Sequence, residues 1–156
     1  MRLTRHSDYA LRVLLYLGAT EEGLVTIGAI AQRFGISRNH LMKVVNRLAA
    51  YGYVETLRGK RGGIHLAVAP EEIRIGALLR RTAEDFSLAE CFNPRGQRCR
   101  IEGTCAVRAL LGEALDAFFE VLDRYTLDDL LQNRHDLAAD LALTERPPCR
   151  SSGSST

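Results

Sequence analysis

Three cysteines, Cys91, Cys99 and Cys105, lie close together in the chain. Seven residues separate the first two, and five separate the last two. The residues between Cys91 and Cys99 are mostly polar, so these thiols are not expected to act as small apolar members of a core. Thiolates are soft ligands that suit zinc and iron-sulfur clusters, and clustered cysteines in a loop usually indicate metal or redox chemistry. The pattern favours one shared metal site.

The spacing also distinguishes between metals. Structural zinc sites usually hold cysteines in pairs about two to four residues apart. The wider gaps here favour an iron-sulfur cluster, which normally takes four protein ligands, so one iron must be completed by another group. The negative charge of such a centre would be offset by the helix N-terminus expected at Cys105 and by four nearby arginines, Arg95, Arg98, Arg100 and Arg108.

The remaining cysteine, Cys149, lies in the Pro, Ser and Gly-rich segment 144–156, which is predicted to be disordered. We interpret Cys149 as a spare thiol. The N-terminal segment resembles a secretory signal only superficially, because Asp8 and Arg12 interrupt its apolar stretch. The longest apolar run is too short to cross a bilayer. We therefore expect a cytoplasmic protein that is not bound to a membrane.

Charge is unevenly distributed along the 156 residues, of which 46% are hydrophobic and 26% charged. Residues 33–65 contain seven Lys or Arg and a single acid, Glu55, whereas residues 109–145 contain nine acids and two Arg. The length allows a small globular domain plus an oligomerisation element. The charge pattern indicates that only the first half of the chain faces nucleic acid.

A helix-turn-helix pattern occupies residues 27–52. An apolar face at helical spacing is followed by Gly35, which allows a tight turn, and by Ser37, which is expected to cap a second helix. In that second helix Asn39, Lys43 and Arg47 fall on one outward face, as phosphate contact and base readout in a major groove require. The candidate DNA contacts of this helix are Ser37, Arg38, Asn39, His40, Lys43 and Arg47.

A basic hairpin follows the helix-turn-helix directly. Residues 54–58 and 64–68 alternate as short strands around the segment GKRGG. Arg58, Lys60 and Arg61 are therefore expected at the hairpin tip, beside the second helix. A basic helix face alone could be merely solvated, but a basic helix-turn-helix with a basic wing favours DNA binding.

The remaining segments complete a mainly α fold, a winged helix-turn-helix with a small β-hairpin wing, a cysteine cluster loop and a long dimerisation helix. Thr4 or Ser7 can cap a first helix, and Pro70 is expected to open a short helix. A long helix beginning near Cys105 is expected to pack on the same helix of a second subunit, on the first helix, or on both. Its predicted apolar stripe is Val107, Leu110, Leu111, Leu115, Phe118 and Leu122. The expected division is 1–82 for DNA binding, 83–106 for the cluster loop, 107–143 for the dimerisation and terminal helices, and 144–156 for the tail.

The chain resembles the bacterial iron-sulfur winged-helix transcriptional regulators. The matching segments are MRLTRHSDYALRVLLYL, GISRNHLMKVVNRLAAYGYVETLRGKRGG and LAECF, together with the three clustered cysteines. The resemblance extends to about Leu131. It implies a homodimer in which a 4Fe-4S or 2Fe-2S cluster controls affinity for double-stranded promoter DNA.

Branches of this group differ in the fourth cluster ligand. The iron-sulfur assembly regulators carry a His three residues after the last Cys, where this chain has Arg108. The nitric-oxide-sensitive repressors place an acid in the first helix, and the resemblance implies that Asp8 reaches the cluster of the other subunit. The helix dipole alone also favours an acid at this position. The segment HLMKVV resembles the nitric-oxide-sensitive branch, whereas the gap between Cys91 and Cys99 resembles the rhizobial iron regulators.

These observations leave three hypotheses. The first is a repressor that senses nitric oxide and releases promoter DNA when nitrosylated. The second is an iron-availability sensor on the same scaffold, and the third is a zinc-bearing or metal-free partner-binding protein. An enzyme is not predicted, because no nucleophile, base and orienting group occur together in the sequence.

Overall fold

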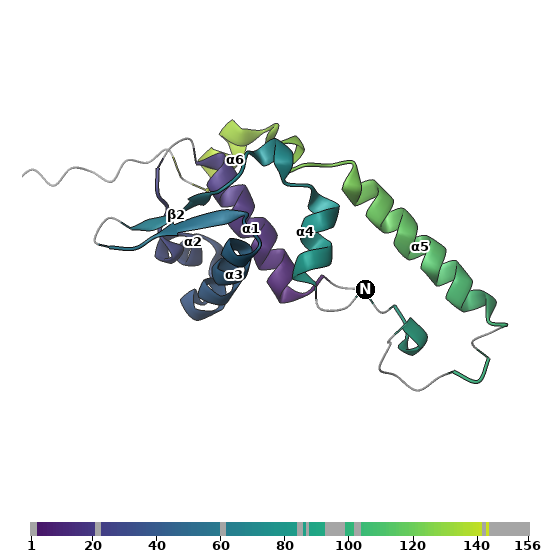
Figure 1. Ribbon diagram of the computed structural model, residues 1–156. Coiled ribbons are helices and arrows are strands. Elements are labelled where there is room, and N and C mark those ends of the chain that lie inside the picture. The colour runs from purple at the N-terminus through teal and green to yellow at the C-terminus, as the bar shows by residue number, and fades with distance from the viewer. Residues whose placement is uncertain are drawn as a thin grey trace, which may run out of the picture.

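The computed structural model describes residues 3–20, 23–59, 62–83, 86, 88–92, 99–101, 104–141 and 143. Helices dominate these residues, and a single antiparallel strand pair accompanies them. Helix α1 (Arg5–Ala19) runs through the middle of the molecule, with the hairpin, α2 and α3 on one side and α5 on the other (Figure 1). The predicted fold class is confirmed.

Helix α1 forms the centre of the core. Thr4 caps it by accepting a hydrogen bond of 3.1 Å from the backbone N–H of Ser7, which satisfies one of the free donors of the first turn. Ser7, the other predicted cap, is instead fully buried, and its hydroxyl lies 3.2 Å from that of Thr82. Ala10, Val13 and Leu14, which follow helical spacing on one face of α1, are fully buried, so this face packs in the core.

The helix-turn-helix consists of α2 (Ile27–Phe34) and α3 (Arg38–Ala50). Gly35 closes α2 with a φ of 63°, a left-handed conformation that glycine adopts without steric cost. Ser37 occupies the N-cap position of α3, but its side chain makes no capping hydrogen bond. The inner face of α3 is buried against the core as predicted, through Leu41, Val44, Val45 and Leu48.

The wing consists of β1 (Val54–Leu57) and β2 (Gly63–Leu66), paired antiparallel with Val54 opposite Leu66. Val25, between α1 and α2, adds a bridge to the hairpin, because its N–H and C=O pair with the backbone of Ile64 at 3.0 and 2.8 Å. The two chains approach so closely that a Cβ on Gly63 would lie 2.8 Å from Leu24 Cβ. Strand β2 is thus hydrogen-bonded on both of its sides, to β1 within the wing and to Val25 of the core.

The segment after the wing differs from the expected helix. Pro70 opens a 3₁₀ turn, η1 (Pro70–Glu72), and α4 (Ile75–Thr82) begins only after it. Next come the short turn η2 (Glu90–Phe92), the long helix α5 (Ala106–Asp123), the turn η3 (Asp129–Leu131) and α6 (Arg134–Asp140). The terminal elements η3 and α6 return to pack against α1. None of the helices in the described ranges combines the length and apolar character that a membrane span requires.

Helix α5 is joined to α4 by a charged clamp. Arg80 donates to both carboxylate oxygens of Asp123, at 2.6 and 2.7 Å, and its guanidinium lies 4.2 Å from the centre of the Phe119 ring. These hydrogen bonds lower the pKa of the Asp123 carboxyl below its ordinary value, with the charges of Arg80 and Arg74 acting in the same direction. The clamp fixes the C-terminal end of α5.

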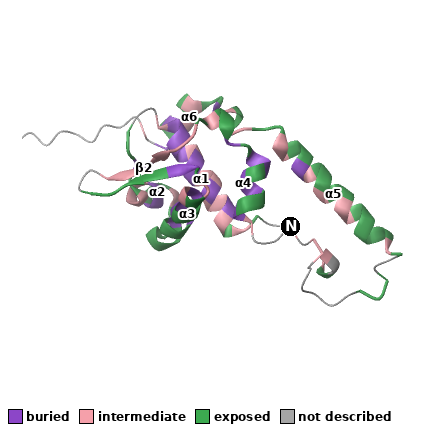
Figure 2. Ribbon diagram, in the orientation of Figure 1, coloured by how far each residue is buried: buried purple, intermediate pink, exposed green. Residues whose placement is uncertain are grey.

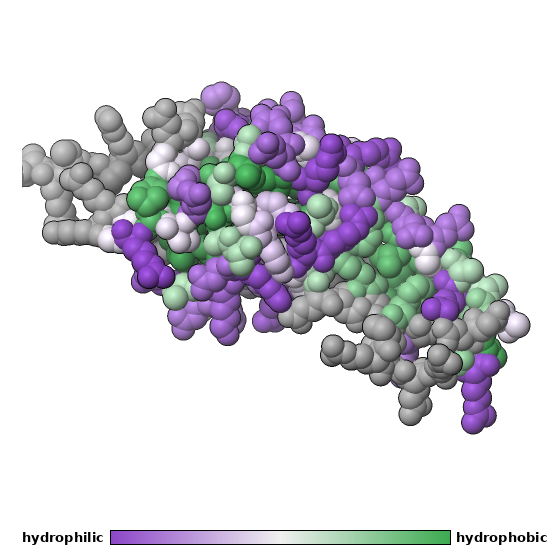
Figure 3. Space-filling model, viewed as in Figure 1, coloured by the Kyte–Doolittle hydropathy of each residue, from purple (hydrophilic) through white to green (hydrophobic). Residues whose placement is uncertain are grey.

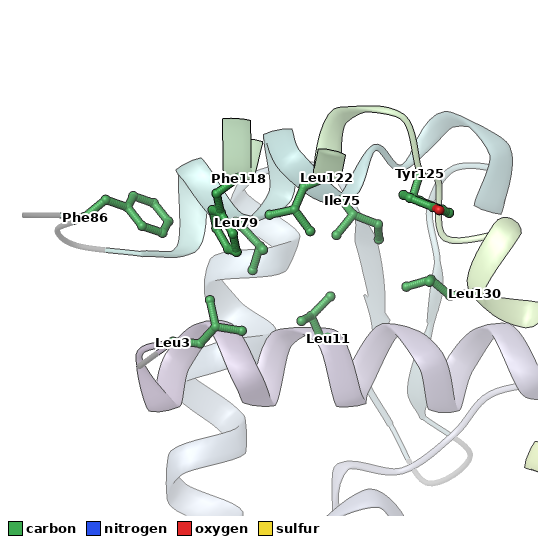
Figure 4. Close-up of a pocket in the computed structure, with 9 residues that line it drawn as sticks. All are labelled: Leu3, Leu11, Ile75, Leu79, Phe86, Phe118, Leu122, Tyr125 and Leu130. Carbon is green, nitrogen blue, oxygen red and sulfur yellow. The ribbon is translucent and has the colours of Figure 1, made fainter. Parts of the chain in front are cut away.

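The rest of α5 projects away from the core and is mostly exposed (Figure 2). Hydrophobic residues reach the surface along it, between charged side chains (Figure 3). Behind its C-terminal half lies an apolar cavity of about 430 Å³, into which Leu11 of α1, Leu79 of α4 and Phe118 of α5 point (Figure 4). Among the described residues, α5 thus joins the hydrophobic core through its C-terminal half.

Candidate functional site

The outward side of α3 forms a basic surface, here called the recognition face, which comprises Arg38, Asn39, His40, Lys43 and Arg47. All five residues are exposed, and α3 contains no acid. Because the opposite side of the helix is buried against α1 and α2, the recognition face is held rigidly outward. Such a helix can insert amide and cationic groups into a major groove.

The wing extends the recognition face. Arg58 is exposed immediately after β1, whereas Lys60 and Arg61, also predicted at the tip, lie outside the described residues. Tyr51 connects the end of α3 to α4 by donating a hydrogen bond of 2.8 Å to the Arg81 carbonyl. Tyr53, directly before β1, donates its backbone N–H to the Leu48 carbonyl of α3 at 3.0 Å, so the start of the wing is fixed relative to α3.

The cysteine segment meets α5 at a hollow of about 660 Å³. Its lining includes Cys105, the N-cap residue of α5, and Phe92, the neighbour of Cys91 in η2. Cys105 is half-buried, and its side chain makes no capping hydrogen bond, so its sulfur remains available to a ligand. Cys105 also lies at the N-terminus of the 18-residue helix α5, where the helix dipole favours a negatively charged group.

The cysteines are only partly brought together. Cys99 is exposed and is not among the described residues that line this hollow. The Cys91 side chain and residues 93–98 lie outside the described part of the chain. Within the described residues, no group of three or more His, Cys, Asp or Glu side chains is placed to hold a metal ion. The donor set nonetheless fits a thiolate-bound centre, since Cys105 and the segment carrying Cys91 share one hollow.

Asp8 lies in the first turn of α1 and is paired within its own helix. Arg12, one turn further, donates from Nε to Asp8 Oδ1 and places Nη2 near Oδ2, both at 3.1 Å. The Arg12 guanidinium also lies 5.7 Å from the centre of the Phe34 ring in α2. The carboxylate is about 40% exposed, so it is accessible from outside the chain.

Comparison with known proteins places this arrangement in a family. The Rrf2 family, described as iron-dependent transcriptional regulators, matches residues 3–133. The chain belongs to the Rrf2 family. It is 47% identical to the HTH-type transcriptional regulator NsrR of Bacillus subtilis, over 93% of this chain and the whole of that protein. It is 52% identical to the NsrR of Geobacillus kaustophilus, over 88% of this chain and 94% of that one.

A solved structure agrees with the fold of this Rrf2 protein. CymR, the global cysteine regulator of B. subtilis, superimposes with a TM-score of 0.67 at 29% identity, covering 83% of this chain and 95% of CymR. The predicted family, the winged-helix fold and a DNA-binding transcriptional regulator rather than an enzyme are thereby confirmed. The individual site residues stay predictions.

Two carboxylates beside the cysteine hollow, those of Glu113 and Asp116, are not expected from the sequence. Glu113 and Asp116 line it beside Cys105, together with Arg108 and Gly112. Counted from Cys105, these residues follow helical spacing, which places them on one face of α5. The sequence shows this periodicity, but it does not show that this face of α5 borders the cysteine segment. The hollow therefore offers carboxylates as well as a thiol.

Proposed function

We propose that this Rrf2 protein is a homodimeric repressor with an iron-sulfur cluster that senses nitric oxide. The repressor releases its promoter DNA when nitric oxide reacts with the cluster. The observation that carries the proposal is the presence in one chain of two features. These are a rigid, exposed basic recognition face and a half-buried thiol at the start of a long helix. The relatives named NsrR, identical at about half of all positions, support it.

DNA recognition rests on the recognition face and the wing. Lys43, Arg47 and Arg58, with Lys60 and Arg61, supply cationic groups for phosphate, which contribute to affinity at every sequence. Arg38 and Asn39 lie at the start of α3, which is the part of a recognition helix that usually contacts base edges. Ser37 and His40 complete this proposed contact surface. We therefore assign recognition of the DNA base sequence to the first turn of α3.

Cys91, Cys99 and Cys105 are proposed to hold the cluster, with Asp8 of the second subunit as the fourth ligand. The cluster supplies iron that can bind nitric oxide. A carboxylate oxygen is harder than a thiolate and less suited to such iron, so Asp8 is the ligand most readily displaced. To ligate through Oδ2, Asp8 has to give up the 3.1 Å contact of that oxygen with Arg12 Nη2. The carboxylate thus has two alternative partners.

The homodimer is supported by a second apolar stripe on α5. Val107, Leu110 and Val121 are 60%, 64% and 46% exposed, and Ala114 and Ala117 between them are also exposed. Their positions follow the three- and four-residue spacing of a coiled-coil seam. Core packing uses another face, through Leu115, Phe118, Phe119 and Leu122. A contiguous exposed apolar stripe of this kind is typical of an interface, and α5 of a second copy would cover it.

Iron availability is the alternative signal, and the description of the Rrf2 family as iron-dependent favours it. In this mechanism the same residues bind the cluster and DNA, but release follows loss of iron. A zinc-bearing or metal-free partner-binding protein has no comparable support. Location in the cytoplasm also remains part of the proposal.

One experiment separates these alternatives. Protein purified without oxygen is titrated with nitric oxide while the fluorescence anisotropy of bound promoter DNA is recorded, and a parallel sample receives an iron chelator. Visible thiolate-to-iron absorption with DNA release by nitric oxide supports the proposal. Release by the chelator alone identifies an iron sensor, and colourless protein that binds zinc or no metal contradicts both cluster mechanisms.

A further inference from the structure

A small basic pocket lies where the start of α1 meets α3. It has a volume of about 210 Å³ and is lined by Arg5, His6 and Tyr9 of α1 and by His40, Lys43 and Val44 of α3. Neither the sequence pattern nor the comparisons assign a role to the three α1 residues. Four of the six lining residues carry basic side chains, from two helices that are distant in sequence.

The charge around this pocket is not neutralised by acids of the two helices. Helix α3 contains no acid, and Asp8 is the single acid of α1. Asp8 is paired with Arg12 at 3.1 Å, on the side of α1 that leads toward Phe34. The N-terminal end of α1, at Arg5, adds the positive end of a 15-residue helix dipole. The pocket is therefore suited to an anion.

The pocket is also continuous with the recognition face, because His40 and Lys43 belong to both. A duplex that receives α3 in its major groove places backbone phosphates along the sides of that helix. A phosphate that binds beside His40 and Lys43 would therefore lie in the pocket that Arg5 also lines, where Arg5 can contact it.

We propose that this pocket binds one backbone phosphate of the DNA in each subunit, with Arg5 and Lys43 as its permanent cations. The Tyr9 hydroxyl and the His40 ring, which also line the pocket, can donate further hydrogen bonds. The inference rests on the proposed DNA-binding function and extends the interface to α1. Since Asp8 lies in the same first turn of α1, the phosphate contact and the proposed cluster ligand belong to one rigid element.

Salt dependence of DNA binding tests the pocket directly. Each phosphate neutralised by a cation contributes about 0.9 to the slope of log affinity against log salt. Arg5→Ala should flatten the slope by up to about 0.9 for each subunit, which corresponds to a loss of affinity of up to about fivefold per pocket at 0.15 M salt. A fluorescent duplex of arbitrary sequence serves as the probe, since the phosphate contribution does not depend on sequence. Arg5→Lys, which keeps the charge, should retain the slope.

Matched variants make each outcome decisive. Arg124→Ala removes an exposed arginine beyond the end of α5 and should leave the slope unchanged. Arg5→Ala combined with Lys43→Ala should flatten the slope less than the sum of the single changes, because both side chains contact one phosphate. If Arg5→Ala leaves the slope unchanged while Arg58→Ala weakens binding, the phosphate site in the pocket is rejected, and the rest of the DNA interface stands. If neither variant affects DNA affinity, the proposed DNA interface fails as a whole, wing and pocket together.

Free phosphate is the other source of this anion. Inorganic phosphate is therefore exchanged for chloride at equal ionic strength, without DNA, and the melting temperature is recorded. Stabilisation that depends on Arg5, together with a DNA salt slope that does not, would assign the pocket to free phosphate and overturn the proposal. No stabilisation by free phosphate, with the slope change present, supports a site for DNA.

Discussion

Asp8 and Arg12 form a two-point pair one turn apart on α1, and Arg12 also lies over the ring of Phe34 in the helix-turn-helix. The pair connects the proposed fourth cluster ligand to the DNA-binding half of the chain. A carboxylate that moves from Arg12 to iron would leave the guanidinium without its partner beside α2. We therefore expect the partner of Asp8 to affect the contact between α1 and α2.

Replacement of Asp8 by Ala should leave a cluster that is present but changed in its reaction with nitric oxide. The three thiolates remain, while the iron served by the oxygen ligand loses it. Iron and sulfide content should stay near the wild-type level, and the rate of the absorbance change with nitric oxide, measured by stopped flow, should differ. Asp136→Ala on α6 is the matched control. Identical kinetics in Asp8→Ala and the wild type would exclude Asp8 as a ligand.

Single replacement of Cys91, Cys99 or Cys105 by Ala should abolish stable cluster binding, because two thiolates cannot replace a set of four protein ligands. Cys149→Ala should have no effect. The measurement is iron per chain and visible absorption after anaerobic purification. Loss of colour in Cys149→Ala, with colour retained in Cys99→Ala, would show that the ligands have been misassigned.

The first turn of α3 and the wing should differ in their effect on DNA binding. Loss of Arg38 or Asn39 should cost roughly 1 to 3 kcal/mol on the promoter and reduce discrimination against other sequences. The triple variant Lys43→Ala, Arg58→Ala and Arg61→Ala should weaken binding to every sequence and flatten its salt dependence. Competition between promoter and unrelated DNA measures both effects. Unchanged binding by the triple variant would contradict the interface.

The clamp between Arg80 and Asp123 should make the attachment of α5 sensitive to acid. Because the folded pKa of Asp123 lies below its unfolded value, the stabilisation is present above the unfolded pKa and is lost as pH falls through the folded pKa. Asp123→Asn should therefore lower the melting temperature at pH 7, and the difference should shrink below about pH 4. Added salt should reduce it as well, since both side chains are partly exposed. Asp136→Asn, on another helix, provides the control.

The fold was predictable where local chemistry determines it. Gly35 adopts the left-handed turn that its position between two helices requires, and the periodicity of α3 places Leu41 and Leu48 in the core. The bridge between Val25 and Ile64 was not predicted, because a single residue pairing across the chain leaves no periodic pattern. The sequence predicts a helix that opens at Pro70, whereas α4 begins at Ile75, because Pro70 is equally suited to the first position of a 3₁₀ turn.

The candidate site was predictable in residue type but not in arrangement. The sequence identifies Cys105 as a helix-terminal thiol, but it does not show that Phe92 and Asp116 lie in the same hollow, because that depends on how η2 meets α5. Helix α5 presents a similar problem. It is apolar on two faces, and periodicity alone cannot tell which face packs on its own core. The structure assigns Phe119 to the core and leaves Leu110 exposed.

This exposure leads to a prediction about assembly. Leu110→Glu places a charge in the middle of the exposed stripe of α5, where α5 of a second subunit would have to bury it, and burial of an unpaired charge is strongly unfavourable. The dimer should dissociate, as measured by sedimentation. DNA affinity should also fall, because each subunit would then contact only one half-site. The variant should remain folded, since Leu110 is 64% exposed in the single chain. Glu120→Ala, also exposed on α5 but outside the stripe, should stay dimeric. A dimeric Leu110→Glu protein would show that the subunits associate through another surface.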